Sequence, residues 1–212
     1  MSSIEKVFRP SPIEVLARTV LRDLDAAGPV YGLPRESLVE PDARMSFVRY
    51  GVEVGAPLGV AAGPHTQMTQ NIVAAWLCGA RFIELKTVQI LDEIKVSRPC
   101  IDSEDETFNC EWSQELTLDQ AFDEYLKAWV LIHILAHKLG RKSPKVFFSM
   151  SVGYDLAGIQ SEKVQRFFRR MRDCSVELRE AIAKVASIYP QISQVHIPSQ
   201  MSNQITLSTM HG

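Results

Sequence analysis

The sequence predicts an α/β protein: the first half of a (β/α)8 TIM-type barrel, with about four parallel strands and their helices, preceded by an amino-terminal helix and a β-hairpin. Apolar strand patterns alternate with helical patterns along residues 57–212, which is typical of a parallel sheet with right-handed crossovers. The chain has 212 residues. Four strands and three helices make about half of a barrel that needs roughly 250 residues. A small open α/β sheet is the alternative.

The composition indicates a protein with a real core and no nucleic-acid partner. The apolar fraction is 46%, which is enough for a buried core. The formal net charge is −2, so the sequence lacks the excess positive charge that attracts nucleic acid. No apolar run is long enough to span a bilayer, and residues 1–12 lack the apolar region of a signal peptide. We therefore expect a cytoplasmic protein that does not interact with membranes.

Residues 1–56 are expected to form an extension before the barrel. Ser11, Pro12 and Glu14 predict a helix start, with Ser11 as the cap and Glu14 completing a capping box. Residues 45–55 alternate in polarity around Gly51, which predicts a β-hairpin. By analogy with barrel enzymes, this hairpin would cover the amino-terminal mouth.

Residues 57–212 are expected to hold the half-barrel. The patterns predict strands at 58–62, 81–88, 145–151 and 205–210, and helices at 71–78, 116–139 and 161–188. An acidic stretch at 90–114 is long for a loop in a compact domain, and such loops are usually functional or disordered. A fourth strand without a covering helix would expose apolar surface. We therefore expect a fragment, or a chain that needs a partner to complete its core.

The strongest candidate ligand site lies where the first two strands end, because ligands bind at the carboxyl ends of parallel strands. Ala61, Ala62 and Gly63 would let a planar or anionic ligand lie close to the backbone, and their amides could donate to it. Lys86 stands in an apolar strand, where a lysine is costly to bury unless it is paired. It should meet an anion or an electron-rich cofactor. Alternatively, it reaches solvent or pairs with Glu84 or a loop carboxylate.

Polar residues near the later strands add weaker candidates. Asn109, in the acidic stretch, could hydrogen-bond a heterocycle or stabilise a turn. Hydroxyl residues alternate on the third and fourth strands, where they could line a ligand site or bond the backbone. These residues are Ser149, Ser151, Thr206 and Ser208.

The histidines suggest proton transfer rather than metal binding. His65 and His211 fall at carboxyl ends of strands, which suits proton transfer. His133 and His137 are one helical turn apart, but the intervening glutamate and the third ligand of a known metal motif are missing. We therefore predict no metal site.

Several long motifs resemble known flavin enzymes. The stretch PLGVAAGPHTQ…GARFIELKTVQ resembles the start of the flavin barrel in dihydroorotate dehydrogenases and in the pyrimidine half of dihydropyrimidine dehydrogenase. AAGPHTQ, FIELKTVQILD, PCIDSEDETFNCEWS, EYLKAW, MSVGYDLAGI and LSTMHG resemble the amino-terminal part of a bacterial family named as the selenate reductase iron–sulfur flavoprotein subunit. The resemblance implies an FMN-dependent oxidoreductase that acts on a small molecule. It implies FMN contacts at Ala61, Ala62, Gly63, Lys86, Thr87, Asn109, Ser149 and Ser208.

The resemblance also implies a longer parent protein. The rest of the barrel and the reductase and ferredoxin modules would be its partners, and 4Fe-4S clusters, FAD and NADPH would belong to those parts. The run Thr206–Met210 differs from the Asn-Leu-Ser-Cys-Pro type motif of dihydroorotate dehydrogenases, so a pyrimidine substrate is not expected. Residues 1–212 lack the barrel's usual phosphate loops, so this chain by itself should bind FMN weakly or not at all. Two alternatives are an aldolase-type barrel with a Schiff base on Lys86, and a non-catalytic truncated fragment.

Overall fold

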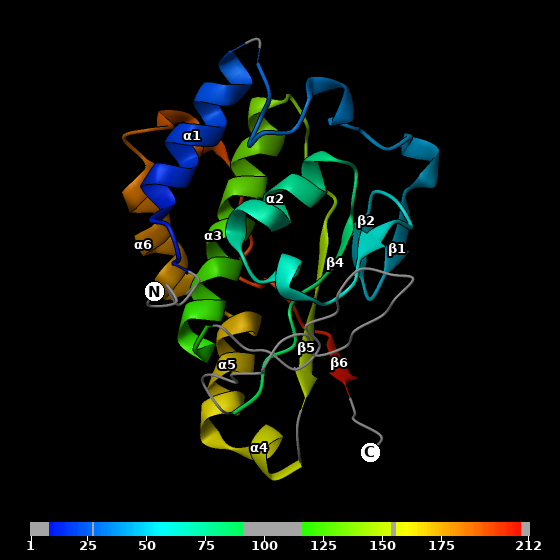
Figure 1. Cartoon of the computed structure of the whole chain (residues 1–212), viewed down its shortest axis with the longest axis vertical. Helices are drawn as coiled ribbons and strands as arrows, with labels where there is room; N and C mark the ends of the chain where they lie inside the picture. The colour runs from blue at the N-terminus through cyan, green and yellow to red at the C-terminus, as the bar shows by residue number, and fades with distance from the viewer. Residues whose placement is uncertain (1–8, 27, 91–115, 154–155, 209–212) are drawn as a thin grey trace, which may run out of the picture.

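A four-stranded parallel sheet with the order β3-β4-β5-β6 is the centre of the computed structural model (Figure 1). Its strands are β3 (Gly59–Val60), β4 (Phe82–Glu84), β5 (Phe147–Gly153) and β6 (Ile205–Ser208). The structure describes residues 9–26, 28–90, 116–153 and 156–208. Each strand pairs with the next one in the chain, always in parallel. This order without a switch point is that of a barrel, and it confirms the expected half-barrel sheet.

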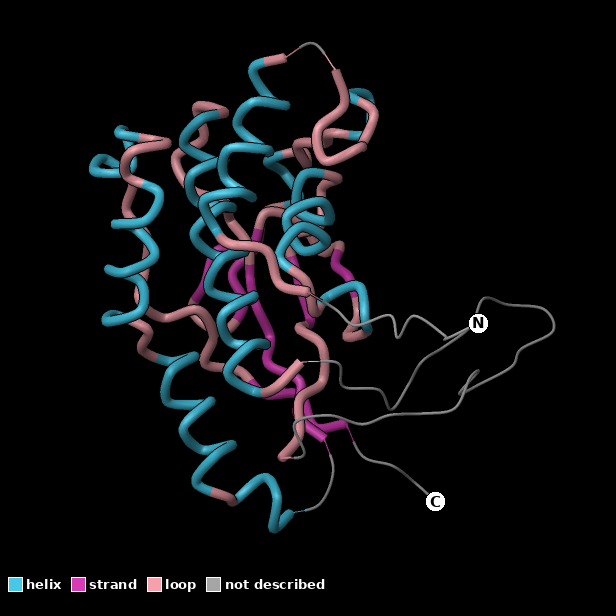
Figure 2. The backbone as a smooth tube through the Cα atoms, turned by 60° about the vertical axis from the view of Figure 1, so that its left-hand side comes forward, coloured by secondary structure: helices cyan, strands magenta, loops and turns pink. Residues whose placement is uncertain are grey.

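The helices lie on one side of the sheet and the hairpin on the other in Figure 1, and Figure 2 shows the same helical layer from another direction. The helices are α1 (Ile13–Asp25), α2 (Thr69–Leu77), α3 (Leu118–Lys138), α4 (Leu156–Gln160), α5 (Glu162–Arg172) and α6 (Ser175–Val185). Phe148, Met150 and Val152 of β5 are buried in the same core as α3. Trp129 of α3 contacts the Phe148 ring edge-on at 5.1 Å between centroids. The core therefore lies between the sheet and its helices.

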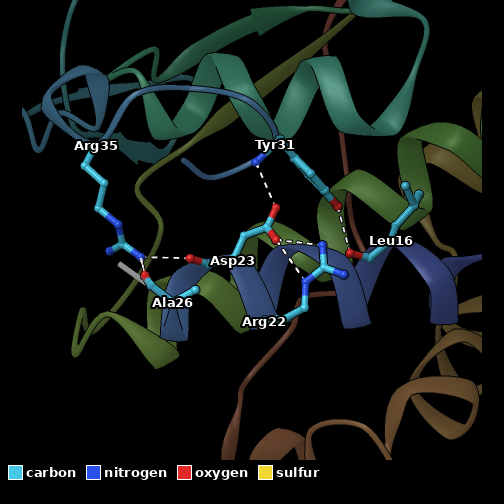
Figure 3. A network of polar contacts seen from close by, with 6 residues as sticks. All are labelled: Leu16, Arg22, Asp23, Ala26, Tyr31 and Arg35. Carbon is cyan, nitrogen blue, oxygen red and sulfur yellow. Dashed lines mark hydrogen bonds and ion pairs between the residues drawn. The ribbon is translucent and has the colours of Figure 1, made fainter. Parts of the chain in front are cut away.

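The segment after α1 is held to that helix by the hydrogen bonds drawn in Figure 3. The Tyr31 hydroxyl donates to the carbonyl oxygen of Leu16 at 2.8 Å, and the Arg35 guanidinium donates to the carbonyl oxygens of Asp23 and Ala26. The last carbonyls of a helix have no partner within it, so Arg35 caps the carboxyl end of α1. Residues of α1 belong to the same buried core as the barrel helices. The expected domain division at residue 56 stays a prediction.

The predicted hairpin is present as β1 (Phe47–Arg49) and β2 (Val52–Val54), which pair antiparallel. Tyr50 and Gly51 in the turn both have positive φ, as a two-residue hairpin loop of type I′ requires. The amide of Gly55 donates to the carbonyl oxygen of Lys145 at 2.9 Å, just before β5 begins. The hairpin therefore packs against the amino-terminal ends of the strands, as expected by analogy.

The capping box predicted at residue 11 is wrong. The N-cap of α1 is Pro12, and no side chain caps this helix. The carbonyl oxygen of Ser11 instead accepts a hydrogen bond from the Lys127 ammonium at 3.0 Å. The residue before the N-cap of α1 is therefore bonded to a distant helix, α3.

The helical stretch predicted at 161–188 is divided. It breaks between α5 and α6 at Asp173 and Cys174, where the amide and thiol of Cys174 both donate to the carbonyl oxygen of Ser199 at 2.9 Å. The strand β3 is also shorter than predicted, whereas residues 209–210 of the predicted fourth strand lie outside the described residues. On β6, Ile205 is 37% exposed and Leu207 is 60% exposed. The apolar surface expected beside the fourth strand is therefore open.

Candidate functional site

The turn after β3 is held by two side chains that come from outside it. The amide of Ala62 donates to Oε2 of Glu84 at 3.1 Å. The amide of Gly63 donates to Oγ1 of Thr66 at 3.1 Å, and the Thr66 hydroxyl donates back to the Gly63 carbonyl oxygen at 3.1 Å. The expectation that the amides of Ala62 and Gly63 stand ready to donate to a ligand is therefore wrong, because the chain itself satisfies them.

A β-bulge interrupts the pairing of β4 with β5. Glu84 pairs with Ser149, whereas Val88 pairs with Val152, so three residues of the first segment (85–87) face two of the second (150–151). The backbone hydrogen bonds resume beyond it, with the Val88 amide donating to the Ser151 carbonyl oxygen at 3.0 Å. The regular strand predicted over 81–88 is thus wrong beyond Glu84. Bulges are frequent next to active sites, where they re-aim side chains.

Lys86 lies within this bulge and is 4% exposed. Its amide donates to the Thr66 carbonyl oxygen at 3.3 Å, and its own carbonyl oxygen accepts from the Tyr125 hydroxyl at 3.1 Å. The alternative in which Lys86 reaches solvent is therefore wrong. Its predicted contact with a cofactor stays a prediction.

Hydroxyl groups pair with one another across three strands. Thr87 of the bulge and Ser151 of β5 share a hydrogen bond of 2.8 Å, and Ser149 of β5 and Thr206 of β6 share one of 3.1 Å. Ser149 and Ser151 are 3% and 1% exposed. Because a strand points alternate side chains to one face, these serines lie on the face of β5 opposite the helices. They form a buried polar strip on that face of β5.

The remaining predicted residues are placed less fully. The Ser208 backbone pairs with Gly153 at the end of β6, and the His65 ring is exposed. Asn109 and His211 lie outside the described residues. His133 and His137 use their Nδ1 atoms on the Trp129 carbonyl and the Tyr189 hydroxyl. No cluster of three or more potential ligands from His, Cys, Asp or Glu occurs in the described part of the chain.

A cavity of about 400 Å³ lies beside β3 and β4. It is lined by Phe47, Pro57, Gly59, Val60, Ala61, Phe82 and Glu84. Among these, Ala61 is the residue that the sequence predicts as a ligand contact. It belongs to the turn that Glu84 holds, so the cavity extends to this turn. The predicted site residues thus fall into two groups: Ala61 at this cavity, and Lys86 and Thr87 of the bulge with Ser149 of the neighbouring β5. Glu84 is close to both groups because it accepts the Ala62 amide and stands just before the bulge.

Sequence reasoning missed the two residues that organise this region. Thr66 is 1% exposed although it stands in a polar stretch that was expected to be a loop, and it belongs to a short 3-10 helix at Pro64–Thr66. For Glu84 the sequence indicates merely an ion pair with Lys86. A polar residue of the type that caps backbone amides, three positions after Gly63, was the available signal for Thr66.

The fold and site define a half-barrel of the TIM type with its candidate ligand residues at the carboxyl ends of consecutive parallel strands. The family described as "Oxidoreductase YgfK, N-terminal TIM-barrel domain" matches residues 31–212. The chain belongs to this family.

Curated relatives agree with the family match. The chain is 40% identical over 227 residues to "Putative oxidoreductase YgfK" of Escherichia coli strain K12, and equally to the protein of that name in Escherichia coli O157:H7. Each alignment covers 97% of this chain, and the chain spans 22% of the length of these relatives. A solved structure of a ligand-free type DHODH from Eimeria tenella is similar with a TM-score of 0.40 and 16% identity, covering 92% of this chain and 60% of that one.

In the described residues, no helix has both the length and the apolar character needed to cross a membrane.

Proposed function

We propose that this chain is the amino-terminal half-barrel of a flavin-dependent oxidoreductase that uses FMN to oxidise or reduce a small molecule. The observation that carries the proposal is Lys86, a lysine 4% exposed in a bulge at the carboxyl end of β4. A cation here stands at the edge of a parallel sheet where ligands of this fold bind, and its charge can stabilise negative charge on a bound ring system. A flavin is a ligand of suitable kind, and the description of the family as an oxidoreductase supports redox chemistry.

The residues around the turn after β3 fit a flat ligand. Ala61 is exposed and Ala62 is half-buried, and neither has a side chain that would keep a ring system away from the backbone. The buried hydroxyls of Ser149 and Ser151 make the neighbouring surface polar. Bound FMN would supply hydride or single-electron transfer.

In this proposal each group of residues has a separate task. Ala61–Gly63 provide a flat surface, and the Lys86 ammonium offsets negative charge on the ligand. Thr87 and Ser149 contribute polar groups on the same edge. Asn109 and Ser208 complete the proposed contacts, as the resemblance to flavin barrels implies.

The first experiment is an FMN titration of the complete natural polypeptide that contains this chain. We expect a protein that purifies yellow or takes up FMN, and that loses most of its flavin in Lys86→Ala. Lys142→Ala is the matched control, because that lysine is exposed. A wild-type protein that stays colourless after FMN is added would exclude the proposal.

The buried lysine also suits a Schiff-base aldolase, in which an amine kept from water acts as the nucleophile. Borohydride would trap such an enzyme as a covalent adduct on Lys86 in the presence of its carbonyl substrate. The same treatment would leave a flavin enzyme unmodified at this position. A non-catalytic role would be supported if neither FMN uptake nor an adduct were found.

The more specific parts of the proposal rest on the sequence, chiefly on the resemblance of its motifs to known flavin enzymes. They are the assignment as a selenate reductase iron–sulfur flavoprotein subunit, the reductase and ferredoxin modules with 4Fe-4S, FAD and NADPH, and the cytoplasmic location. Metal and flavin analysis of the complete polypeptide would test the cofactors together.

A further inference from the structure

We propose that Thr66 and Glu84 are positioning residues for the turn at residues 61–63, which is called the ligand turn below. They set the shape of this turn and its distance from Lys86. This inference rests on the proposed function, because the ligand is taken to be FMN. Neither residue is assigned a contact with the flavin. Their part is to hold the backbone at Ala62, Gly63 and Lys86 in one arrangement before the ligand binds.

The Thr66 side chain closes the turn on itself. Its hydroxyl accepts from the Gly63 amide and donates to the Gly63 carbonyl oxygen, both at 3.1 Å. One hydroxyl can do both at once, because it carries one donor and two acceptor lone pairs. Thr66 is 1% exposed, so water does not compete easily for these bonds.

The Thr66 backbone also connects the ligand turn to the segment that follows β4. Its carbonyl oxygen accepts the Lys86 amide at 3.3 Å. In a regular parallel sheet the Lys86 amide would donate to a carbonyl oxygen of the neighbouring strand β3. That strand already ends at Val60, so it does not extend far enough to accept this hydrogen bond. The short helix at Pro64–Thr66 therefore replaces β3 as the neighbour of the bulge. The Gly63 backbone and the Lys86 backbone are joined through a single residue.

Glu84 makes the second link between the same two segments. Its Oε2 atom accepts the Ala62 amide at 3.1 Å, and it is the last residue of regular β4 before the bulge. A carboxylate accepts backbone amides more strongly than a neutral group does. The turn is thus anchored to this segment at two points, by a side chain at residue 84 just before the bulge and by a backbone bond at residue 86 within it.

A pre-set turn binds its ligand more tightly than one that must be ordered on binding, because the ordering cost has already been met. Each link is worth about 1 kcal/mol, which corresponds to roughly a fivefold change in affinity. Loss of either link should therefore weaken FMN binding without removing any atom that contacts the flavin.

The test compares four variants of the complete natural polypeptide by FMN titration and visible absorption spectrum. Thr66→Val keeps the shape but removes the hydroxyl, and Thr66→Ser restores it. Glu84→Ala removes the acceptor, and Glu84→Gln keeps an acceptor without the charge. We expect Thr66→Val and Glu84→Ala to weaken FMN binding about five- to tenfold and to shift the flavin spectrum. Thr66→Ser and Glu84→Gln should stay within about threefold of the wild type.

Ser202→Ala separates positioning from general stability. Its buried hydroxyl donates to the Phe148 carbonyl oxygen at 2.7 Å, away from the turn, so it should lower stability and leave FMN affinity and spectrum unchanged. Amide hydrogen exchange without flavin gives a second readout: Ala62 should exchange faster in Glu84→Ala, and Gly63 faster in Thr66→Val.

The outcomes distinguish this inference from the function on which it rests. If the wild type takes up no FMN, the proposed function fails. If the wild type binds FMN and Thr66→Val and Glu84→Ala bind it equally well with an unchanged spectrum, the proposed function stands and the positioning role is overturned. Equal losses in Glu84→Gln and Glu84→Ala would also overturn it, since the charge rather than the hydrogen bond would then matter.

Discussion

Gly59 and Phe82 lie so close across β3 and β4 that a Cβ atom on Gly59 would stand 2.0 Å from the Phe82 carbonyl oxygen. That oxygen is backbone, so it cannot rotate away, and the two strands would have to separate. β3 is the short first strand of the sheet and precedes the ligand turn directly. Its glycine is therefore required by the close approach of the two backbones.

Gly59→Ala should destabilise this chain by about 2 kcal/mol or more, a cost typical of overpacking. Urea unfolding followed by circular dichroism would measure it. Gly28→Ala is the matched control, because no atom lies within 4 Å of a Cβ placed there. A Gly59→Ala protein as stable as the control would show that β3 can shift without cost.

Gly63→Ala should weaken FMN binding, and the additional substitution His65→Ala should largely restore it. A Cβ at residue 63 would lie 2.7 Å from Cε1 of the His65 ring, and this ring is exposed. The clash is thus with a movable side chain. We expect FMN affinity to fall in Gly63→Ala and to recover largely in the double variant with His65→Ala. A double variant no better than Gly63→Ala would mean that the ligand, and not His65, occupies the space.

Glu124 in α3 should be among the residues most costly to remove. It is fully buried, forms an ion pair with Lys127, and its Oε2 atom accepts from the Thr69 amide at 2.7 Å at the start of α2. Removing it would leave the Thr69 amide without this acceptor and the Lys127 ammonium without its buried counter-charge, although Asp123 at 3.1 Å and the Ser11 carbonyl oxygen would still contact Lys127. Breaking a buried pair in this way costs about 3 kcal/mol or more. Urea unfolding of Glu124→Ala would measure this loss.

Glu124→Gln serves as the control for that measurement. Its side-chain oxygen can still accept from Thr69, so it should lose less than Glu124→Ala. If both variants unfolded at the urea concentration of the wild type, the buried pair would contribute no net stability.

His133 should make the folded state sensitive to acid. Burial lowers the pKa of this histidine from 6.5 to about 4, although a hydrogen bond to the Trp129 carbonyl opposes the shift. Between these two pH values the unfolded chain binds the proton more readily, so stability is complete above pH 6.5 and falls as the pH drops towards 4. The total loss from this group is on the order of 3 kcal/mol.

Urea unfolding at several pH values would test this. His133→Phe should show a flatter dependence of stability on pH between 6.5 and 4, whatever its stability at pH 7. An unchanged slope in that window would show that His133 does not cause the acid sensitivity.

Much of the fold was predictable because its signals are local. The alternation of apolar strands with amphipathic helices predicted four parallel strands in chain order, and the structure confirms that order. The hairpin was predictable because Gly51 interrupts two alternating runs, and Gly51 indeed has positive φ in the turn. Periods of two and of 3.6 residues can be recognised within a short segment.

Element ends were less predictable, because contacts between distant segments decide them. The N-cap of α1 lies one residue after the expected cap, next to a carbonyl oxygen of Ser11 that accepts from Lys127. The helix expected over 161–188 breaks where Cys174 bonds Ser199. No periodicity within either segment carries information about these partners.

The sequence by itself determined the class of sheet, and it placed Lys86 in an apolar segment near the sheet edge where we expect a ligand. Only the tertiary structure decided that Lys86 lies in a bulge, because a bulge is a mismatch in register between two strands that are far apart in the chain. It likewise decided that Glu84 and Thr66 accept hydrogen bonds from the amides of Ala62 and Gly63. Those hydrogen bonds require the strands to be docked side by side, and docking depends on the packing of the whole core.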